Sequence, residues 1–170
     1  VDGPLWLGGG EPTTRADLPT VVGALGAAFD LGLETDGLAL ASPATCRALR
    51  DMGLSRVRVR VFAGRRDAHD WLAGQPGASK AVVRAVAAAL DQGLEVHADI
   101  PVTRPTTPLL PETVALLVEL GVRHVRVRRA DARWLDPDDA VALQPRLGLL
   151  EPELEAAVRV ARRRGARVEL

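Results

Sequence analysis

The stretch Met52-Gly53-Leu54-Ser55-Arg56-Val57-Arg58-Val59-Arg60-Val61 joins the end of a helix pattern to a strand pattern. Glycine is the residue type that ends a helix most easily, because it takes positive φ without a Cβ clash. After the glycine, arginine and valine alternate strictly, which is the period-two pattern of a strand with one apolar face. This join therefore predicts a helix, a glycine stop and a strand in close succession.

The same kind of join recurs along the chain, at Gln92-Gly93-Leu94, Leu120-Gly121-Val122 and Arg164-Gly165-Ala166. Strands that alternate with amphipathic helices form βαβ units, so the sequence predicts an α/β fold with parallel strands and right-handed crossovers. The expected strands are Leu5–Gly8, Leu31–Thr35, Arg56–Phe62, Glu95–Val102, His124–Arg128 and Arg167–Leu170. The helices predicted between them include Leu18–Phe29, Thr45–Met52 behind Ser42-Pro43, and Lys80–Leu90 capped by Ser79; the apolar stripes Val114–Val118 and Leu154–Ala161 indicate two more. The longest irregular stretch runs from Ala132 to Gly148.

Composition narrows the class of protein. The 170 residues are 47% hydrophobic, which is enough for one well-buried core, and we expect residues 1–170 to form one domain. The 22 basic and 22 acidic residues balance, so neither nucleic acid nor a membrane is an expected partner, and the expected location is cytoplasmic. The single cysteine, Cys46, excludes a disulfide framework. Because the chain starts at Val1, we expect it to be a segment of a longer protein.

The strands carry charged residues on one face, whereas strands covered on both faces are usually continuous apolar runs. Two interpretations fit. The charged face is either solvated, or it lines a polar cavity inside a curved sheet, with Glu34 and Asp99 as partners for the arginines. Burying unpaired charges is costly, so such a cavity would be wet, internally paired or filled by a polar ligand. We favour the cavity, and expect it to place these residues against a substrate: Arg58, Arg60, His97, Asp99, Arg126 and Arg128.

A glycine-rich turn follows the first predicted strand, in Leu5-Trp6-Leu7-Gly8-Gly9-Gly10-Glu11-Pro12-Thr13. Glycines at the carboxyl end of a strand let the backbone approach a ligand closely, and Glu11 can accept a hydrogen bond from a ligand ammonium. Taken alone, this turn is also typical of an ordinary connection between a strand and a helix.

From Leu5 to about Arg129, the chain resembles the core of radical S-adenosylmethionine (radical SAM) enzymes. The resemblance rests on the order and spacing of several short motifs. They are Gly9-Gly10-Glu11-Pro12-Thr13 with Asp17-Leu18, Thr35-Asp36-Gly37, His69-Asp70-Trp71-Leu72 with Gly74 and Gly77, and the joins Gly93-Leu94-Glu95-Val96 and Gly121-Val122.

The resemblance implies a partial (β/α) barrel with a polar lumen that binds SAM and a [4Fe–4S] cluster. It implies that Gly9, Gly10 and Glu11 contact the SAM amino group, with Thr35 and Asp36 nearby. It also implies that an electron donor reduces the cluster, that SAM is cleaved to a 5′-deoxyadenosyl radical, and that the radical abstracts hydrogen from a small-molecule or peptide substrate. The residues that take part in the chemical step are not identified by the resemblance.

The chain departs from the family pattern in three places. It has no Cys-x3-Cys-x2-Cys, and one thiol cannot supply three thiolate ligands. We therefore expect the first strand and the cluster loop of the family to be absent from this chain, with the cluster ligands outside it. Apolar Val61-Phe62-Ala63-Gly64 stands where the family has polar residues that contact the SAM ribose, and Asp36 replaces an asparagine.

Two other functions stay open. The missing cysteines and the apolar Val61–Gly64 segment also fit a degenerate barrel without a cluster, acting as a binding or partner scaffold. Alternatively, Glu11, Glu34 and Asp99 are acid–base carboxylates of an ordinary (β/α) barrel lyase or isomerase. No metal site is expected, since scattered histidines such as His69 and His97 are usually structural. Trp71 and Trp134 are expected in loops, with ordinary packing roles.

Overall fold

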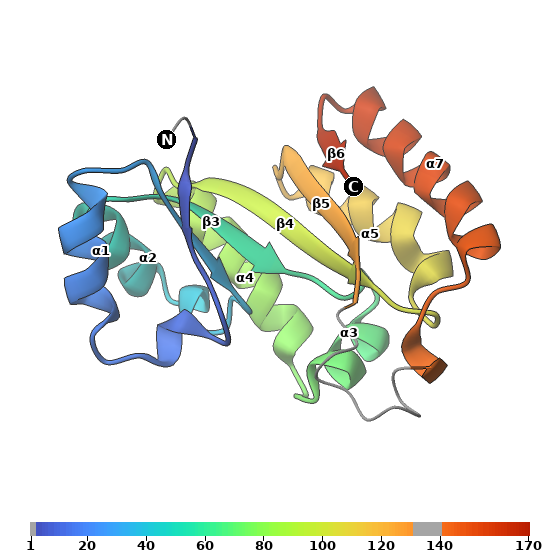
Figure 1. Ribbon diagram of the computed structural model, residues 1–170, viewed down its shortest axis with the longest axis horizontal. Coiled ribbons are helices and arrows are strands. Elements are labelled where there is room, and N and C mark those ends of the chain that lie inside the picture. Colours follow the sequence, from blue (N-terminus) through green and yellow to red (C-terminus); the bar gives the residue numbers. More distant parts are fainter. Residues whose placement is uncertain (1–2, 131–140) are drawn as a thin grey trace. The chain divides into compact units, whose positions relative to one another are not determined.

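The computed structural model describes residues 3–130 and 141–170 (Figure 1). Trp134 and part of the expected irregular stretch lie outside the described residues. The strands are β1 Leu5–Leu7, β2 Leu31–Thr35, β3 Leu54–Arg60, β4 Glu95–Val102, β5 His124–Arg129 and β6 Arg167–Glu169. The helices are α1 Leu18–Gly26, α2 Pro43–Asp51, α3 Arg66–Ala73, α4 Ala78–Asp91, α5 Leu110–Glu119 and α7 Leu147–Arg163. Three short 3-10 helices complete the order: η1 Pro12–Thr14, η2 Ala39–Ala41 and η3 Thr107–Leu109.

The strands follow chain order in the sheet, β1-β2-β3-β4-β5-β6. The pairs β1–β2, β2–β3 and β5–β6 are parallel, as the alternation of strands and helices predicts. The glycine stops are also confirmed, because each of the four has positive φ: Gly53 (110°), Gly93 (78°), Gly121 (102°) and Gly165 (71°). The α/β prediction is therefore correct in the order of the six described strands and in their parallel pairing where the register is given.

The described residues fall into two compact units. Unit 1 contains residues 3–60 and 80–97, and unit 2 contains residues 61–79, 98–130 and 141–170. Each unit has its own buried apolar residues, as set out below. That residues 1–170 form one domain stays a prediction.

In unit 1, the apolar faces of β2 and β3 lie against helices. The register pairs Leu33 with Val57 and Thr35 with Val59, and Leu31, Leu33, Val57 and Val59 are all 0% exposed. α1 contacts both strands, and α2 contacts β3. The residues that alternate with these valines and leucines, such as Glu34 and Arg58, point to the other face.

In unit 2, β5 pairs with β6 and α5 packs along α7. The buried residues of this unit include Val125 and Val127 on β5, Val114 and Leu117 on α5, and Ala157 and Ala161 on α7. α7 begins at Leu147, so the expected irregular stretch ends earlier than predicted. The valines of β5 again alternate with arginines, which leaves Arg126 and Arg128 on one face.

Helix α3 is a correction to the sequence prediction. Trp71 was expected in a loop with a packing role, but it lies on this helix and is 66% exposed. His69 holds α3 in place: it is 2% exposed, and its ring meets Phe62 edge-on at 5.7 Å between centroids. α3 is only eight residues long, and the one residue that it buries is a histidine, so no stripe of buried apolar residues marks it in the sequence.

The start of α4 is a second correction. Ser79 was expected to cap this helix, but it lies within the helix, which begins at Ala78. Asp70 takes that role from α3, accepting hydrogen bonds from the backbone N–H groups of Gly77 and Ser79, both at 2.8 Å. These two bonds hold the pKa of Asp70 at about 2. Among the described residues, no helix combines the length and the apolar character that crossing a bilayer requires.

Candidate functional site

The carboxylate of Glu11 joins the glycine-rich turn after β1 to the end of β2. Its Oε1 accepts hydrogen bonds from the Thr13 backbone N–H at 3.1 Å, the Thr13 hydroxyl at 2.5 Å and the Thr35 hydroxyl at 2.8 Å. Its Oε2 accepts from the Asp36 backbone N–H at 2.6 Å. Burial alone would raise the pKa of Glu11, but these bonds outweigh it and lower the pKa from its ordinary value. We call Glu11, Thr13, Thr35 and Asp36 the Glu11 node.

Asp36 is the second carboxylate of the node. Its Oδ1 accepts from the Leu38 backbone N–H at 2.9 Å, and the Thr35 hydroxyl accepts from the Gly37 N–H at 3.1 Å. Burial, together with the nearby Glu11 charge, raises the pKa of Asp36, while the hydrogen bond from the Leu38 N–H and then Arg60 lower it in part. The node therefore holds one firmly ionised carboxylate beside one that is easier to protonate.

Gly9 and Gly10 shape the turn next to the node. Their φ values are 91° and 60°, a region that residues with a Cβ rarely adopt. Both glycines are exposed, and a Cβ built on either would find no atom within 4 Å. The turn therefore presents bare backbone to open space, which is what close approach of a ligand requires.

Arg58 is fixed on the polar face of unit 1 by two contacts. Its guanidinium carbon lies 3.8 Å from the centroid of the Trp6 ring, and its Nη1 donates to Glu34 at 2.7 Å. Only 11% of the Arg58 side chain is exposed. Gly32 makes room for the Trp6 ring, because a Cβ there would lie 2.5 Å from a ring carbon. The sequence prediction that Glu34 partners an arginine is confirmed.

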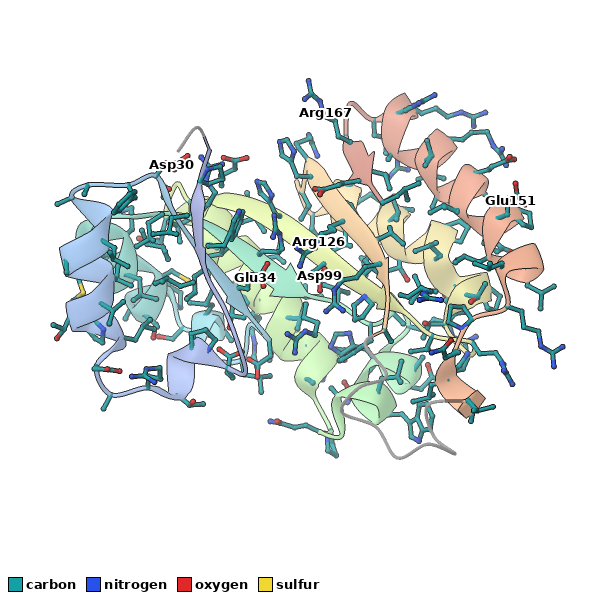
Figure 2. The ribbon with its side chains drawn as sticks, viewed as in Figure 1. Asp30, Glu34, Asp99, Arg126, Glu151 and Arg167 are labelled. Carbon is teal, nitrogen blue, oxygen red and sulfur yellow. The ribbon has the colours of Figure 1, made fainter. Side chains whose placement is uncertain are left out.

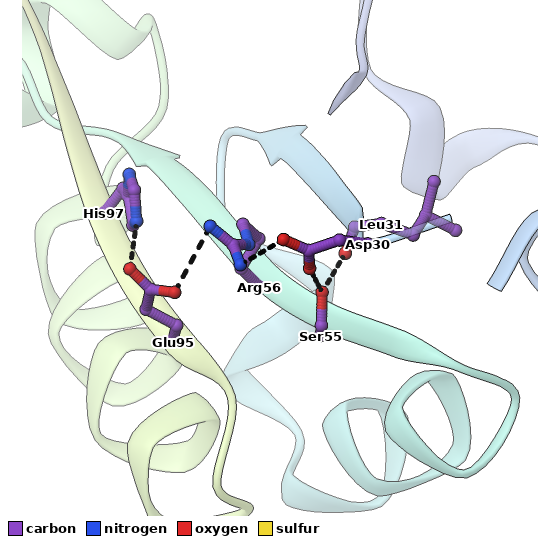
Figure 3. Close-up of polar contacts among 6 residues, drawn as sticks. All are labelled: Asp30, Leu31, Ser55, Arg56, Glu95 and His97. Carbon is purple, nitrogen blue, oxygen red and sulfur yellow. Dashed lines mark hydrogen bonds and ion pairs between the residues drawn. The ribbon is translucent and has the colours of Figure 1, made fainter. Parts of the chain in front are cut away.

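A second polar network lies where β2, β3 and β4 begin (Figure 3). Arg56 forms an ion pair with Asp30 and another with Glu95 at 3.3 Å, and Glu95 is 2.7 Å from His97 Nε2. Ser55 donates its hydroxyl to Asp30 at 2.6 Å and to the Leu31 carbonyl at 2.8 Å. His97 is thus placed toward the amino end of β4, where the Glu95 carboxylate engages it. The sequence analysis did not find this network, because Asp30 lies outside the strand alternation.

Arg60 differs from the other two arginines on β3. Arg56 and Arg58 each form ion pairs with carboxylates, whereas within the described residues no hydrogen bond reaches Arg60. The Nε atoms of all three arginines are buried without a partner among the described residues, so Arg60 differs only in lacking a paired carboxylate there; the residue as a whole is half-buried. Arg60 is the last residue of β3, close enough to Asp36 to act on its pKa. A guanidinium without a bonded acid therefore accompanies the Glu11 node.

On the polar face of unit 2, Asp99 lies beside Arg126 (Figure 2) and also pairs with Arg128. It accepts from Arg126 Nε at 2.7 Å, and from Arg128 Nε at 3.0 Å to Oδ1 and 2.9 Å to Oδ2. This confirms the prediction that Asp99 partners the arginines. The six residues predicted to line a cavity are each buried or half-buried. That they contact a substrate stays a prediction.

No protein-family model matches the chain. A curated relative, the probable GTP 3′,8-cyclase of Halobacterium salinarum, is 38% identical over 109 residues, which cover 64% of this chain and 30% of the relative. The PqqA peptide cyclase of Ruegeria pomeroyi is 28% identical over 169 residues, covering 96% of this chain and 43% of that protein.

Solved structures resemble the chain over nearly its whole length. Coproporphyrinogen III oxidase of Escherichia coli, described as a radical SAM enzyme, matches with a TM-score of 0.75 and 16% identity over 95% of this chain and 40% of its own. Streptococcus suis SuiB bound to S-adenosylmethionine matches with a TM-score of 0.75 and 14% identity over 98% and 38%. The chain therefore resembles the core of radical SAM enzymes in sequence and in fold.

The chain thus has the expected partial (β/α) barrel fold, and the resemblance stated from its motifs is confirmed. A domain of pyruvate-formate lyase-activating enzyme from Bacteroides vulgatus matches with a TM-score of 0.70 and 13% identity, covering 98% of this chain and 97% of that one. The chain spans only 30% to 43% of the length of the curated relatives it matches.

Proposed function

We propose that this chain is the SAM-binding part of a radical SAM enzyme. In such an enzyme, bound SAM is the source of the 5′-deoxyadenosyl radical that takes hydrogen from a substrate. We propose a small-molecule or peptide substrate, an electron donor as partner and a cytoplasmic location. Family resemblance and the geometry of the Glu11 node both support the SAM-binding role.

The observation that carries the proposal is the pairing of opposite charges around an open backbone turn. SAM ends in an α-amino acid, whose ammonium needs acceptors and whose carboxylate needs a donor. The node offers the ionised Glu11 and the exposed backbone of Gly9 and Gly10, and Arg60 brings a guanidinium without a bonded acid. An arginine fork is well suited to a carboxylate.

Two residues of the node, the glycine-rich turn and Arg60 each have a distinct task in this proposal. Four protein hydrogen bonds already engage Glu11, so its main task is to hold the turn against the end of β2 and to supply negative charge. Thr35 relays that connection to the Gly37 backbone. Backbone carbonyls of the Gly9–Gly10 turn then meet the ammonium, and Arg60 meets the carboxylate.

A [4Fe–4S] cluster does not fit the residues of this chain. Cys46 is the only cysteine in the sequence, it is buried in α2, and its Sγ donates to the Leu40 carbonyl at 3.3 Å. Burial raises the pKa of its thiol, which disfavours the thiolate that iron needs. The proposal therefore assigns the cluster ligands to residues outside this chain and derives no step through the cluster.

Calorimetric titration tests SAM binding, with 5′-methylthioadenosine as the probe that lacks the amino acid end. We expect SAM to bind more tightly, and Arg60→Gln to weaken SAM binding about tenfold, because a charge-assisted hydrogen bond contributes about 1.5–3 kcal/mol. Binding of 5′-methylthioadenosine should not change. Arg84→Gln, on the exposed side of α4, is the control that should bind SAM normally. A folded chain that binds no SAM, or binds both probes equally, contradicts the proposal.

The alternative function, a binding scaffold without a cluster, is based on the segment that follows Arg60. Val61 and Ala63 of this segment are each only 3% exposed. Radical SAM enzymes have polar residues there that contact the SAM ribose. Anaerobic reconstitution of the full-length protein with iron and sulfide distinguishes the radical SAM enzyme from the scaffold. An electron paramagnetic resonance signal from a reduced [4Fe–4S] cluster that changes on adding SAM supports the enzyme. A full-length protein that binds SAM but assembles no cluster supports the scaffold.

The lyase or isomerase alternative needs a carboxylate able to move protons. Protein donors hold Glu11 in the ionised form, Glu34 pairs with Arg58, and Asp99 accepts from two arginines. Each candidate acid is thus engaged as an acceptor, which favours the SAM-binding proposal.

A further inference from the structure

The Asp99 triad, defined as Asp99, Arg126 and Arg128, has features beyond those of an ordinary ion pair. Asp99 lies on β4 and only 5% of its side chain is exposed, while Arg126 and Arg128 lie two residues apart on β5 and so share one face. Both arginines use Nε toward Asp99, and Arg128 adds an Nη2 contact at 2.8 Å. One buried carboxylate therefore orients two guanidiniums.

Asp99 bonds both guanidiniums of the triad. Arg126 takes part in further polar contacts, so Arg128 is the member of the triad with an available edge. Its side chain is 33% exposed, and among the described residues its Nη1 has no hydrogen-bond partner. Asp99 fixes the inner edge of Arg128 and leaves the outer edge to donate elsewhere.

We propose that the outer edge of Arg128 binds an oxyanion, a carboxylate or phosphate group carried by the substrate. A planar guanidinium matches either group, and its orientation by Asp99 reduces the entropy lost on binding. Assigning the group to a substrate rests on the proposed function of the chain. The binding of the anion itself is a separate property that can be measured without SAM.

Inorganic phosphate and succinate are the two probes, and potassium chloride at matched ionic strength is the control for screening. Calorimetric titration and thermal unfolding are measured at low salt. The wild-type chain should bind at least one probe saturably and unfold at a higher temperature with it, because a ligand of the folded state stabilises that state. Tighter binding of phosphate or of succinate identifies the chemical group of the substrate.

Arg128→Gln should weaken binding of that probe at least tenfold, while Arg129→Gln, the exposed next residue of the same strand, should leave it unchanged. If Arg128→Gln does not fold, Arg128→Lys decides: it keeps the charge but loses the planar fork, so affinity should fall at least threefold in a folded protein. Equal affinity in the wild type and the Arg128 variants overturns the inference. So does a response no larger than that to potassium chloride.

SAM titration of the same wild-type chain separates this inference from the proposed function. If the chain binds SAM but binds neither phosphate nor succinate saturably, the inference is overturned and the proposed function stands. An anion effect that depends on Arg128, without SAM binding, supports the inference and contradicts the proposed function.

Discussion

The Glu11 node and the Asp99 triad satisfy partly or fully buried carboxylates in opposite ways. Glu11 accepts only from neutral donors, two hydroxyls and two backbone N–H groups. Asp99 accepts only from guanidiniums among the contacts described. A node of neutral donors keeps its negative charge available to a cation, whereas the triad carries positive charge toward an anion. The two units thus offer complementary charges from similar carboxylates.

Asp99→Asn is expected to have the largest effect. It removes the carboxylate that two guanidiniums on one strand face both bond, and breaking a buried pair costs about 3–5 kcal/mol. The free energy of unfolding from urea titration measures this, with exposed Asp67→Asn as the control. Added phosphate should recover part of the loss. A loss no larger than that of Asp67→Asn would show that Asp99 does not hold the two arginines.

Glu11→Gln should cost less, about 2 kcal/mol, because it removes charge-assisted hydrogen bonds but leaves no like charges together. The folded pKa of Glu11 lies below its ordinary value of 4.5. Its stabilisation is therefore present above pH 4.5 and is lost as the pH falls through the folded pKa. In Glu11→Gln, that acid-dependent part of the unfolding free energy should disappear.

Exposed Glu151→Gln is the matched control for Glu11→Gln. Its unfolding free energy should depend on pH in the acid range as that of the wild type does. Added salt sharpens the contrast with Asp99, since it should reduce the effect of Asp99→Asn and hardly change that of Glu11→Gln. If Glu11→Gln keeps the wild-type acid profile, the node is not what lowers this pKa.

Gly32→Ala tests the packing of the Trp6 ring, over which the Arg58 guanidinium lies. A Cβ there would lie 2.5 Å from the Trp6 ring, so we expect a loss of about 1–2 kcal/mol from overpacking. Gly23→Ala is the matched control, because its Cβ would meet nothing and alanine favours the helix. Gly23→Ala should therefore leave stability unchanged or raise it. Equal stability of the two variants would contradict the packing of Trp6 on Gly32.

Protonation of His69 is expected to have the smallest effect on the free energy of unfolding, about 1 kcal/mol. Burial lowers its pKa from 6.5, outweighing the Ala63 backbone and Asp70, which raise it. The folded state therefore prefers the neutral ring, and stability is lost as the pH falls below 6.5 toward the folded pKa. Urea titrations at pH 7.5 and 5.5 should show this loss in the wild type and a smaller one in His69→Gln. An equal loss in both would contradict it.

Much of the fold was predictable because strand alternation and glycine stops are local signals. The valines of Arg56–Val61 and the positive φ of Gly53 need no knowledge of distant residues. Helix α3 was missed because its buried anchor is His69, and the cap of α4 was missed because Asp70 reaches it from another helix. Such contacts depend on tertiary structure, which a local pattern does not encode.

The candidate site was predictable in its residues but not in its bonding. The motif pointed to Gly9, Gly10 and Glu11, yet not to the bonds that Glu11 accepts from Thr35 and Asp36, 24 and 25 residues away. The placement of Arg60 beside this node follows from how β2 and β3 end side by side. Sequence alternation could assign Arg60 to a face, but not show that it lacks the carboxylate partners of Arg56 and Arg58.

A crystal structure of the chain grown with SAM would show where the ligand binds. We expect the methionyl ammonium against the backbone of the Gly9–Gly10 turn, with its carboxylate on the Arg60 guanidinium. SAM bound elsewhere, or a Glu11 node left empty at saturating SAM, would contradict it.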